Sequence, residues 1–210
     1  MIKKEYINIA NILTLSRIIL GIIFFFLFFF ILKIDKTSII IIILKLITLL
    51  IFIIAIITDG LDGYFARKNK EVTDFGKHFD PLADSIFFII VFFSFFYIGI
   101  MPFYFFLIVL FREMFMHLFL RPIIKRKGGS LPANIYGKIK TIFQSVFSII
   151  ILTTLFLIDF IEILLPNSKI VKIVVYISNI VFYIFFVIIV FLSLLSLIIY
   201  IFQIKDKLKS

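Results

Sequence analysis

Residues 38–67 read SIIIIILKLITLLIFIIAIITDGLDGYFAR. From residue 38 to residue 57 the stretch is almost wholly apolar, and Lys45 is its one charged side chain. About 20 apolar residues in a row have the length of a helix that crosses the hydrocarbon core of a bilayer. Asp59, Asp62 and Arg67 follow directly. The stretch therefore predicts a membrane-spanning helix that is followed by an acidic motif.

The composition of the whole chain agrees with a membrane protein. The 210 residues are 63% hydrophobic and 16% charged, and the mean hydropathy is +1.25. Soluble domains carry roughly 45–50% apolar and about 25% charged residues. The composition excludes a water-soluble domain, a disordered chain and a fibrous repeat. Because the chain has no cysteine, a disulfide framework, a thiolate metal site and thiol catalysis are excluded as well.

Further apolar stretches of spanning length lie on both sides of the first. With it they make six candidate spans, at residues 12–32, 38–57, 82–98, 102–120, 142–161 and 174–204. Since a chain in lipid must satisfy its own backbone hydrogen bonds, these stretches are expected to be helices. We therefore expect an all-α integral membrane protein with six transmembrane helices and one domain over residues 1–210.

The distribution of basic residues predicts the orientation. The net charge is +10, and most of the 22 Lys and Arg residues fall on one side of the membrane if the N-terminus is inside. Loops rich in Lys and Arg stay on the cytoplasmic side. Both termini are therefore expected to be cytoplasmic. In such a protein the positive charge indicates contact with anionic membrane lipids and not with nucleic acid.

Two pairs of aspartates stand at the ends of predicted spans. Asp59 and Asp62 are three residues apart, and Asp80 and Asp84 are four apart, so each pair lies on one face of a helix. If the connection between them is tight, the two pairs face each other and repel unless cations lie among them. Magnesium is expected first and manganese second, because hard cations prefer oxygen ligands. With no cysteine and only His78 nearby, zinc is not expected.

The segment between the aspartate pairs suits phosphate chemistry. Gly63, Ala66 and Gly76 are small, which allows a bulky ligand to approach the backbone closely. Arg67 could bind a phosphate through its guanidinium fork. Two metal ions near a membrane surface would bridge phosphate oxygens and offset the charge on a leaving group. An Asp-x-x-Asp motif that stands alone is usually a solvated helix cap. Here the two aspartate pairs, the small residues and Arg67 occur together, which favours a functional site.

The motif DGLDGYFAR at residues 59–67, followed by Gly76, Asp80 and Asp84, resembles the signature of the CDP-alcohol phosphatidyltransferase family. The resemblance implies the CDP-alcohol phosphotransferase fold and a CDP-linked lipid substrate, usually CDP-diacylglycerol, with its diphosphate on two metal ions. An alcohol hydroxyl attacks the phosphate next to the diacylglycerol, and CMP leaves.

The resemblance also implies residue roles. The metal ligands would be Asp59, Asp62, Asp80 and Asp84, and Asp84 would also be the candidate catalytic base. Residues 11–17, NILTLSR, look like the opening motif of the bacterial phosphatidylglycerophosphate synthases within this family. The implied CDP-lipid-binding residues are Asn11, Thr14, Arg17, Gly63, Ala66, Arg67, Thr73 and Gly76.

The acceptor is harder to predict. Arg112-Glu113 and residues 137–141, with Gln144, also resemble the bacterial synthases, which use glycerol 3-phosphate. Ser85 departs from that group, where a lysine is expected. Arg112, near the cytoplasmic end of its span, is expected to face the bundle interior, while the adjacent Glu113 is not expected to face Arg112. The predicted acceptor-phosphate-binding residues are Arg112, Lys138 and Lys140.

Several alternatives stay open. The same chemistry could use another acceptor, such as phosphatidylglycerol (giving cardiolipin), inositol phosphate or serine. A divalent-cation channel or transporter is the non-enzyme alternative, and an intramembrane prenyltransferase fits the chain length and the motif spacing less well. The oligomeric state is open, with a homodimer as one alternative. The resemblance places the protein in the bacterial cytoplasmic (inner) membrane, with its active site on the cytoplasmic side.

Two further patterns are interpreted as contacts with lipid. Phenylalanines fill residues 24–26 and 28–30, and they cannot all lie on one face of a helix. Arg121 and the basic residues 125–127 form a basic run before the glycines at 128 and 129. We expect both segments to face lipid. His117 is given no role.

Overall fold

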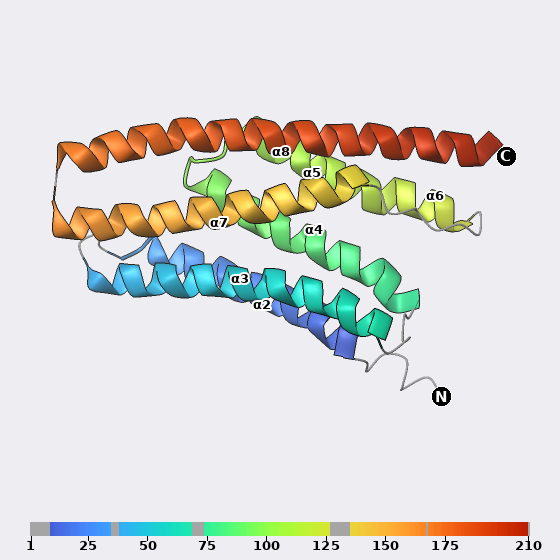
Figure 1. Cartoon of the computed structure of the whole chain (residues 1–210), viewed down its shortest axis with the longest axis horizontal. Helices are drawn as coiled ribbons and strands as arrows, with labels where there is room; N and C mark the ends of the chain where they lie inside the picture. The colour runs from blue at the N-terminus through green and yellow to red at the C-terminus, as the bar shows by residue number, and fades with distance from the viewer. Residues whose placement is uncertain (1–8, 35–37, 69–73, 127–134, 167, 210) are drawn as a thin grey trace. The chain divides into compact units, whose positions relative to one another are not determined.

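The computed structural model describes residues 9–34, 38–68, 74–126, 135–166 and 168–209, and every regular element within these ranges is a helix (Figure 1). The helices are α2 (Ile9–Ile31), α3 (Ile39–Lys68), α4 (Asp74–Tyr97), α5 (Phe103–Phe115), the π-helical segment η1 (Met116–Leu120), α6 (Arg121–Arg126), α7 (Ile135–Leu164) and α8 (Lys169–Lys209).

Six helical stretches are long and apolar enough to cross a membrane. They are Ile12–Ile31, Ile39–Leu61, Phe79–Tyr97, Phe103–Ile124, Ile135–Leu164 and Lys169–Lys205. This finding confirms the prediction of an all-α protein with six spans. The side of the membrane on which each terminus lies stays a prediction, as does a single domain over residues 1–210.

The helices extend beyond the predicted apolar spans, and this decides where the aspartates lie. α3 continues to Lys68, well past residue 57, and α4 already begins at Asp74. Hydropathy detects only the part of a helix that lies in hydrocarbon, so the polar helical turns at the span ends escape it. Asp59, Asp80 and Asp84 are therefore held on regular helices, with Pro81 inside α4.

The chain divides into two compact units. Unit 1 is made by the described residues of Met1–Ser94 and Ser148–Ile177, and unit 2 by those of Phe95–Phe147 and Ser178–Ser210. Unit 1 contains α2, α3 and most of α4. Unit 2 contains α5, η1, α6 and the longer part of α8.

Aromatic rings fill the core of unit 1, where α2 and α3 lie side by side (Figure 1). Phe24 packs on Phe28 with ring centroids 5.7 Å apart, and on Phe52 of α3 at 6.4 Å. Phe52 stacks on Phe87 of α4 at 5.5 Å. The expectation that the whole phenylalanine run faces lipid is therefore wrong for Phe24 and Phe28. Residues four apart share a helix face, so these two rings turn inward, whereas Phe26 is 67% exposed.

Gly21 lets α2 approach α4 closely. A Cβ atom at this position would lie 3.2 Å from Cδ2 of Phe87 and 3.4 Å from Cδ1 of Ile90. A Cβ atom here would therefore require the buried Phe87 ring to shift by a few tenths of an ångström. The close approach places α2 and α4 so that polar residues on the same helices can meet, as described below.

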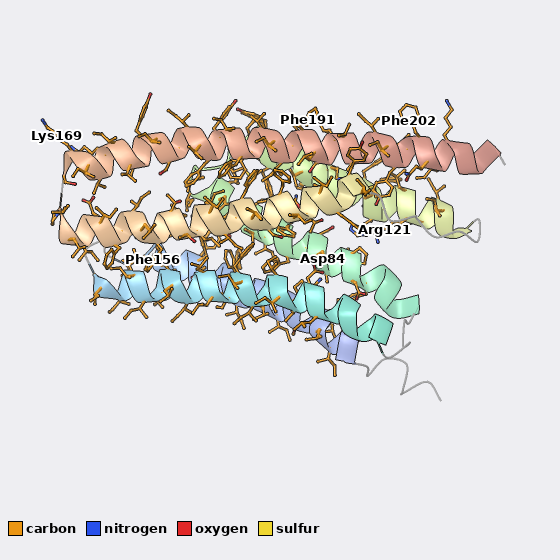
Figure 2. All side chains as sticks on the ribbon, in the orientation of Figure 1. Asp84, Arg121, Phe156, Lys169, Phe191 and Phe202 are labelled. Carbon is orange, nitrogen blue, oxygen red and sulfur yellow. The ribbon has the colours of Figure 1, made fainter. Side chains whose placement is uncertain are left out.

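In unit 2 the continuous helix α5–η1–α6 packs along α8. Met116, Leu120 and Ile124 are buried against Ile204, and Leu197 and Tyr200 pack around this cluster. The outer side of α8 carries exposed apolar side chains such as Phe191 and Phe202, at 63% and 60% exposure (Figure 2). Such a surface requires an apolar surrounding, which a bilayer provides.

Candidate active site

A buried arginine joins two of the predicted metal-binding aspartates in unit 1. Arg17 of α2 is 1% exposed, and its Nη2 lies 3.2 Å from Oδ1 of Asp59 on α3. Its Nη1 forms a second ion pair with Oδ1 of Asp84 on α4. One guanidinium therefore links three helices through two ion pairs.

A second contact, one helical turn away on α2, also links this helix to α4. Thr14, which is buried at 1% exposure, donates a hydrogen bond from Oγ1 to Oδ1 of Asp80 at 2.7 Å. Asp80 is also within electrostatic range of Arg17 and Asp59. Thr14 and Arg17 are three residues apart on α2, and Asp80 and Asp84 are four apart on α4, so each pair shares a face. The structure thus brings five predicted site residues together.

The carboxylates are more accessible than the arginine that holds them. The side chains of Asp59 and Asp84 are 37% and 28% exposed, against 1% for Arg17. Figure 2 labels Asp84 on α4. A buried arginine thus holds Asp59 and Asp84, while part of each carboxylate stays exposed.

The donor set fits a hard divalent cation by its chemistry. All three described carboxylates offer oxygen atoms, which Mg²⁺ and Mn²⁺ prefer. Among the side chains that the structure describes, however, no three acidic, His or Cys residues form a group that could hold a metal ion. Arg17 lies between Asp59 and Asp84, and the fourth predicted ligand, Asp62, has a side chain outside the described set. The metal site stays a prediction.

Other predicted residues also fall outside the described side chains. Asn11, Gly63, Ala66, Arg67 and Gly76 lie on helices α2, α3 and α4, but their side chains are not among those described. Thr73 lies outside the described residues altogether. The predicted contacts of these residues with a CDP-lipid therefore stay predictions.

Unit 2 contains a separate buried cluster of charged side chains. Arg112 of α5 donates from Nη1 to Oε1 of Glu113 at 2.8 Å and from Nη2 to Oγ of Ser196 on α8, also at 2.8 Å. Lys140 of α7 donates from Nζ to the same Oε1 of Glu113 at 2.6 Å. All four residues are buried, at 7% exposure or less. One carboxylate oxygen of Glu113 thus accepts hydrogen bonds from two cationic side chains on different helices.

Two expectations about this cluster are wrong. Glu113 does face Arg112, because the long arginine side chain can fold back to a neighbour that a shorter one could not reach. Arg112 is also not near the end of its span: it lies nine residues after Phe103, about 13 Å along the axis of a helix that continues to Arg126. Lys138 is exposed, in contrast to Lys140, and its contact with an acceptor stays a prediction.

Sequence reasoning missed Ser196 and the inward position of Arg121. Ser193 and Ser196 are both fully buried and three residues apart on one face of α8. Two hydroxyls at that spacing in an apolar helix are a signal, present in the sequence, for a buried polar contact. Arg121 is half-buried and lies within electrostatic range of Glu113 and Arg112, which corrects its assignment to a lipid-facing run.

Comparisons with known proteins agree with the motifs. The model of the CDP-alcohol phosphatidyltransferase family matches residues 7–204. Two curated relatives carry the name CDP-diacylglycerol–glycerol-3-phosphate 3-phosphatidyltransferase. The Mycoplasma pneumoniae protein is 38% identical over 96 residues, which are 46% of this chain and 42% of the relative. The Treponema pallidum protein is 41% identical over 91 residues, which are 43% of this chain and 42% of the relative.

A longer match is found with a Mycobacterium tuberculosis protein named as a phosphatidylglycerophosphate synthase with the prefix "Probable". It is 31% identical over 144 residues, 69% of this chain and 65% of the relative. The chain spans less than half the length of the first two relatives. The family model covers nearly all of the described helices and includes both charged clusters. The chain belongs to the CDP-alcohol phosphatidyltransferase family.

Proposed function

We propose that the protein is an integral membrane enzyme that transfers a phosphatidyl group from CDP-diacylglycerol to glycerol 3-phosphate, giving phosphatidylglycerophosphate and CMP. The observation that carries this proposal is the set of contacts from Thr14 and Arg17 to Asp59, Asp80 and Asp84, at the signature positions of the family. Two relatives named for this reaction are 38% and 41% identical over the matched residues.

Members of the family use divalent metal ions. In this chain Asp59, Asp62, Asp80 and Asp84 would hold two ions, Mg²⁺ or Mn²⁺, whose charge would offset that of the diphosphate and of the departing CMP. Arg17 fixes the carboxylates of Asp59 and Asp84, and Thr14 fixes that of Asp80.

The reaction is a substitution at phosphorus. The acceptor hydroxyl forms a new O–P bond at the phosphate next to the diacylglycerol, and the bond to the CMP oxygen breaks. Asp84, partly exposed on α4, accepts the hydroxyl proton as the general base. Asn11, Thr14, Arg17, Gly63, Ala66, Arg67, Thr73 and Gly76 contribute to the site for the CDP-lipid.

The buried cluster of unit 2 supports a phosphorylated acceptor. Arg112 and Lys140 carry two positive charges, and Glu113 carries one negative charge. A buried excess of positive charge is costly unless an anion compensates it. We assign Arg112 and Lys140, with the exposed Lys138 nearby in the sequence, to binding the acceptor phosphate. The protein would work in the bacterial cytoplasmic membrane with this chemistry on the cytoplasmic side, as a monomer or homodimer.

A panel of acceptors tests the proposal. The purified protein would be given radiolabelled CDP-diacylglycerol with glycerol 3-phosphate, phosphatidylglycerol, inositol phosphate or serine, and CMP and lipid products would be measured. Product with glycerol 3-phosphate is expected. Product with another acceptor alone would overturn the assignment of the acceptor. Divalent-cation flux in proteoliposomes without CMP release would favour a channel or transporter.

Removal of metal and of its ligands gives the first prediction. EDTA should abolish CMP release, and added Mg²⁺ or Mn²⁺ should restore it. Asp59→Asn and Asp80→Asn should lower turnover by at least about a hundredfold, because the lost ligand removes an ion that neutralises the transition state. Asp206→Asn, which changes an aspartate outside the signature, serves as the control. Full activity in EDTA would contradict the metal site.

A further inference from the structure

Gly21 lies on the same buried face of α2 as Thr14 and Arg17. The buried residues of this helix follow one another at intervals of three and four: Thr14, Arg17, Gly21, Phe24, Phe28 and Ile31. Residues at these intervals share one face of a helix. The polar end of this face contacts Asp80 and Asp84 of α4, and the apolar part begins at Gly21. Gly21 thus stands where the polar and the apolar contacts between α2 and α4 meet.

The close approach of α2 and α4 at Gly21 lies directly beside these polar contacts. A Cβ atom at Gly21 would lie 3.2 Å from Cδ2 of Phe87 and 4.0 Å from Cε2 of the same ring. Gly21 follows Arg17 by four residues, which is about 6 Å along the helix axis. Phe87 follows Asp84 by three residues, which is about 4.5 Å. The spacing of the two helices at Gly21 therefore carries over to the ion pair one turn away.

The ring of Phe87 has little room to yield. Phe87 is 1% exposed, and its ring stacks on Phe52 of α3 with centroids 5.5 Å apart. The ring also contacts Phe24 at 6.5 Å and Phe88 at 5.9 Å. Packed interiors transmit strain, because they hold few voids into which a side chain can move. An added methyl group at Gly21 would therefore push α4 away from α2 and would not be absorbed by the ring alone.

The spacing of α2 and α4 matters for the predicted metal ligands on α4. Thr14 holds Asp80 through a hydrogen bond of 2.7 Å, and Arg17 holds Asp84 through an ion pair. Both contacts need α2 at its present distance, because hydrogen bonds have a narrow range of lengths. Mg²⁺ demands a near-ideal octahedron of oxygens at about 2.0–2.1 Å, whereas Ca²⁺ accepts a variable number at about 2.3–2.6 Å. A displacement of a few tenths of an ångström therefore weakens the binding of Mg²⁺ more than that of Ca²⁺.

We propose that Gly21 is a positioning residue for the metal site: the close approach that it allows keeps Asp80 and Asp84 where Thr14 and Arg17 hold them, and this makes the site select Mg²⁺ over the larger Ca²⁺. The proposal rests on the proposed function, because Asp80 and Asp84 are metal ligands of that reaction. Gly21 has no side chain with which to bind a ligand, so it acts through the distance between two helices. It lies outside the motifs that the sequence assigns to the site.

Binding of metal ions to the purified protein in detergent tests the proposal without turnover. Bound Mn²⁺ is measured by electron paramagnetic resonance, and Mg²⁺ or Ca²⁺ is added until it displaces Mn²⁺. In Gly21→Ala the dissociation constant of Mg²⁺ should rise about tenfold and that of Ca²⁺ less than about threefold. Gly21→Val, with a larger side chain, should widen this difference, and the alanine variant decides if the valine variant does not fold. Equal changes for both ions, or no change for either, would overturn the proposal.

Phe93→Leu is the matched control for loss of packing. Phe93 joins α4 to α2 through ring contacts with Phe25 at 6.4 Å and Phe29 at 6.2 Å, but it lies nine residues beyond Asp84. The variant should lower the unfolding temperature without changing the ratio of the Mg²⁺ and Ca²⁺ dissociation constants. An altered ratio in Phe93→Leu would show that loosened packing alone causes the change, and would overturn the role of Gly21.

A second substitution should restore the site. Phe87→Val removes both ring atoms that a methyl group at Gly21 would meet. Combined with Gly21→Ala, it should bring the dissociation constant of Mg²⁺ back to within about threefold of the wild type, although the smaller core lowers stability. A double-mutant cycle measures this coupling. Additive effects of the two substitutions on Mg²⁺ binding would contradict a spacing that Gly21 sets against Phe87.

Kinetics and metal binding together separate the two proposals. In Gly21→Ala the Mg²⁺ concentration for half-maximal CMP release should also rise about tenfold, while KM for glycerol 3-phosphate stays within about twofold. Product from glycerol 3-phosphate with an unchanged Mg²⁺ requirement would overturn the role of Gly21 and leave the reaction standing. A wild-type protein that gives no product with any acceptor, together with a shifted metal preference in Gly21→Ala, would overturn the reaction and leave the role of Gly21.

Discussion

At the scale of single residues, Arg17 organises the site in unit 1. The guanidinium carries five N–H donors in one plane, and its two terminal nitrogens form ion pairs with carboxylates from two different helices. Two carboxylates held this close repel each other unless a cation compensates them. A buried arginine is suited to this task because it stays charged under all ordinary conditions. Arg17 therefore positions Asp59 and Asp84.

Replacement of Arg17 should separate positioning from charge. Arg17→Ala should lower turnover at least about tenfold, because the two aspartates lose a charged hydrogen-bond partner. Arg17→Lys should lower turnover less, because the lysine keeps the positive charge but can reach only one of the two carboxylates with good geometry. CMP release at saturating concentrations of both substrates measures the effect. Lys172→Ala, an exposed cation in the same unit, is the control, and wild-type turnover in Arg17→Ala would refute this assignment.

At the scale of helices, an ion pair within the apolar part of unit 1 joins α3 to α7. Nζ of Lys45 lies 2.5 Å from Oδ2 of Asp159 and donates to the backbone oxygen of Leu155 at 3.1 Å. The side chains are only 20% and 12% exposed. A charge among apolar residues is costly unless it is paired. The pair therefore fixes the register of one helix against the other.

Removing one partner of this pair should be worse than removing both. Lys45→Met leaves Asp159 as an uncompensated carboxylate and should lower the free energy of unfolding by about 3 kcal/mol. The double variant with Asp159→Leu should recover most of that loss, because apolar residues of similar volume replace the pair. Thermal or SDS-induced unfolding of the protein in detergent provides the measurement. A single variant as stable as the wild type would show that the pair contributes nothing.

At the scale of the whole molecule, the helices are longer than a bilayer requires. α8 has 41 residues, which corresponds to about 60 Å, roughly twice the 30 Å of a hydrocarbon core. It must therefore tilt or extend into water at one or both ends. Its first residue, Lys169, and its last residues are basic, and the charge bias predicts that they lie on opposite sides of the membrane.

The orientation can be measured directly because the chain has no native cysteine. Lys169→Cys and Lys205→Cys each introduce one exposed thiol, near the two ends of α8. In intact cells, a membrane-impermeant maleimide should label Lys169→Cys and not Lys205→Cys, since Lys-rich segments stay inside. In inverted vesicles the result should reverse. Labelling of Lys205→Cys from outside would contradict the predicted cytoplasmic C-terminus.

Sequence by itself determined the apolar surroundings, the helices and the residue types that meet in the unit 1 cluster. Apolar runs of about 20 residues can only be spanning helices in lipid, and the spacing of Asp80 and Asp84 places them on one face wherever the helix goes. Their meeting with Thr14 and Arg17 depends on contacts between residues 66 positions or more apart. The resemblance to the family predicted that these four residues belong to the site. The packing of α2 against α4 decided that Thr14 contacts Asp80 and that Arg17 contacts Asp84.

Only the tertiary structure decided which members of a repetitive pattern face inward. Phe24 and Phe26 look alike in the sequence, but one is buried and the other is 67% exposed. Arg121 belongs to a basic run in the sequence, and the structure places it half-buried, directly after a π-helical segment that the pattern does not reveal. The physical reason is that periodicity fixes the angles between residues of one regular helix. Which face meets a neighbour, and where a turn takes up an extra residue, is set by packing.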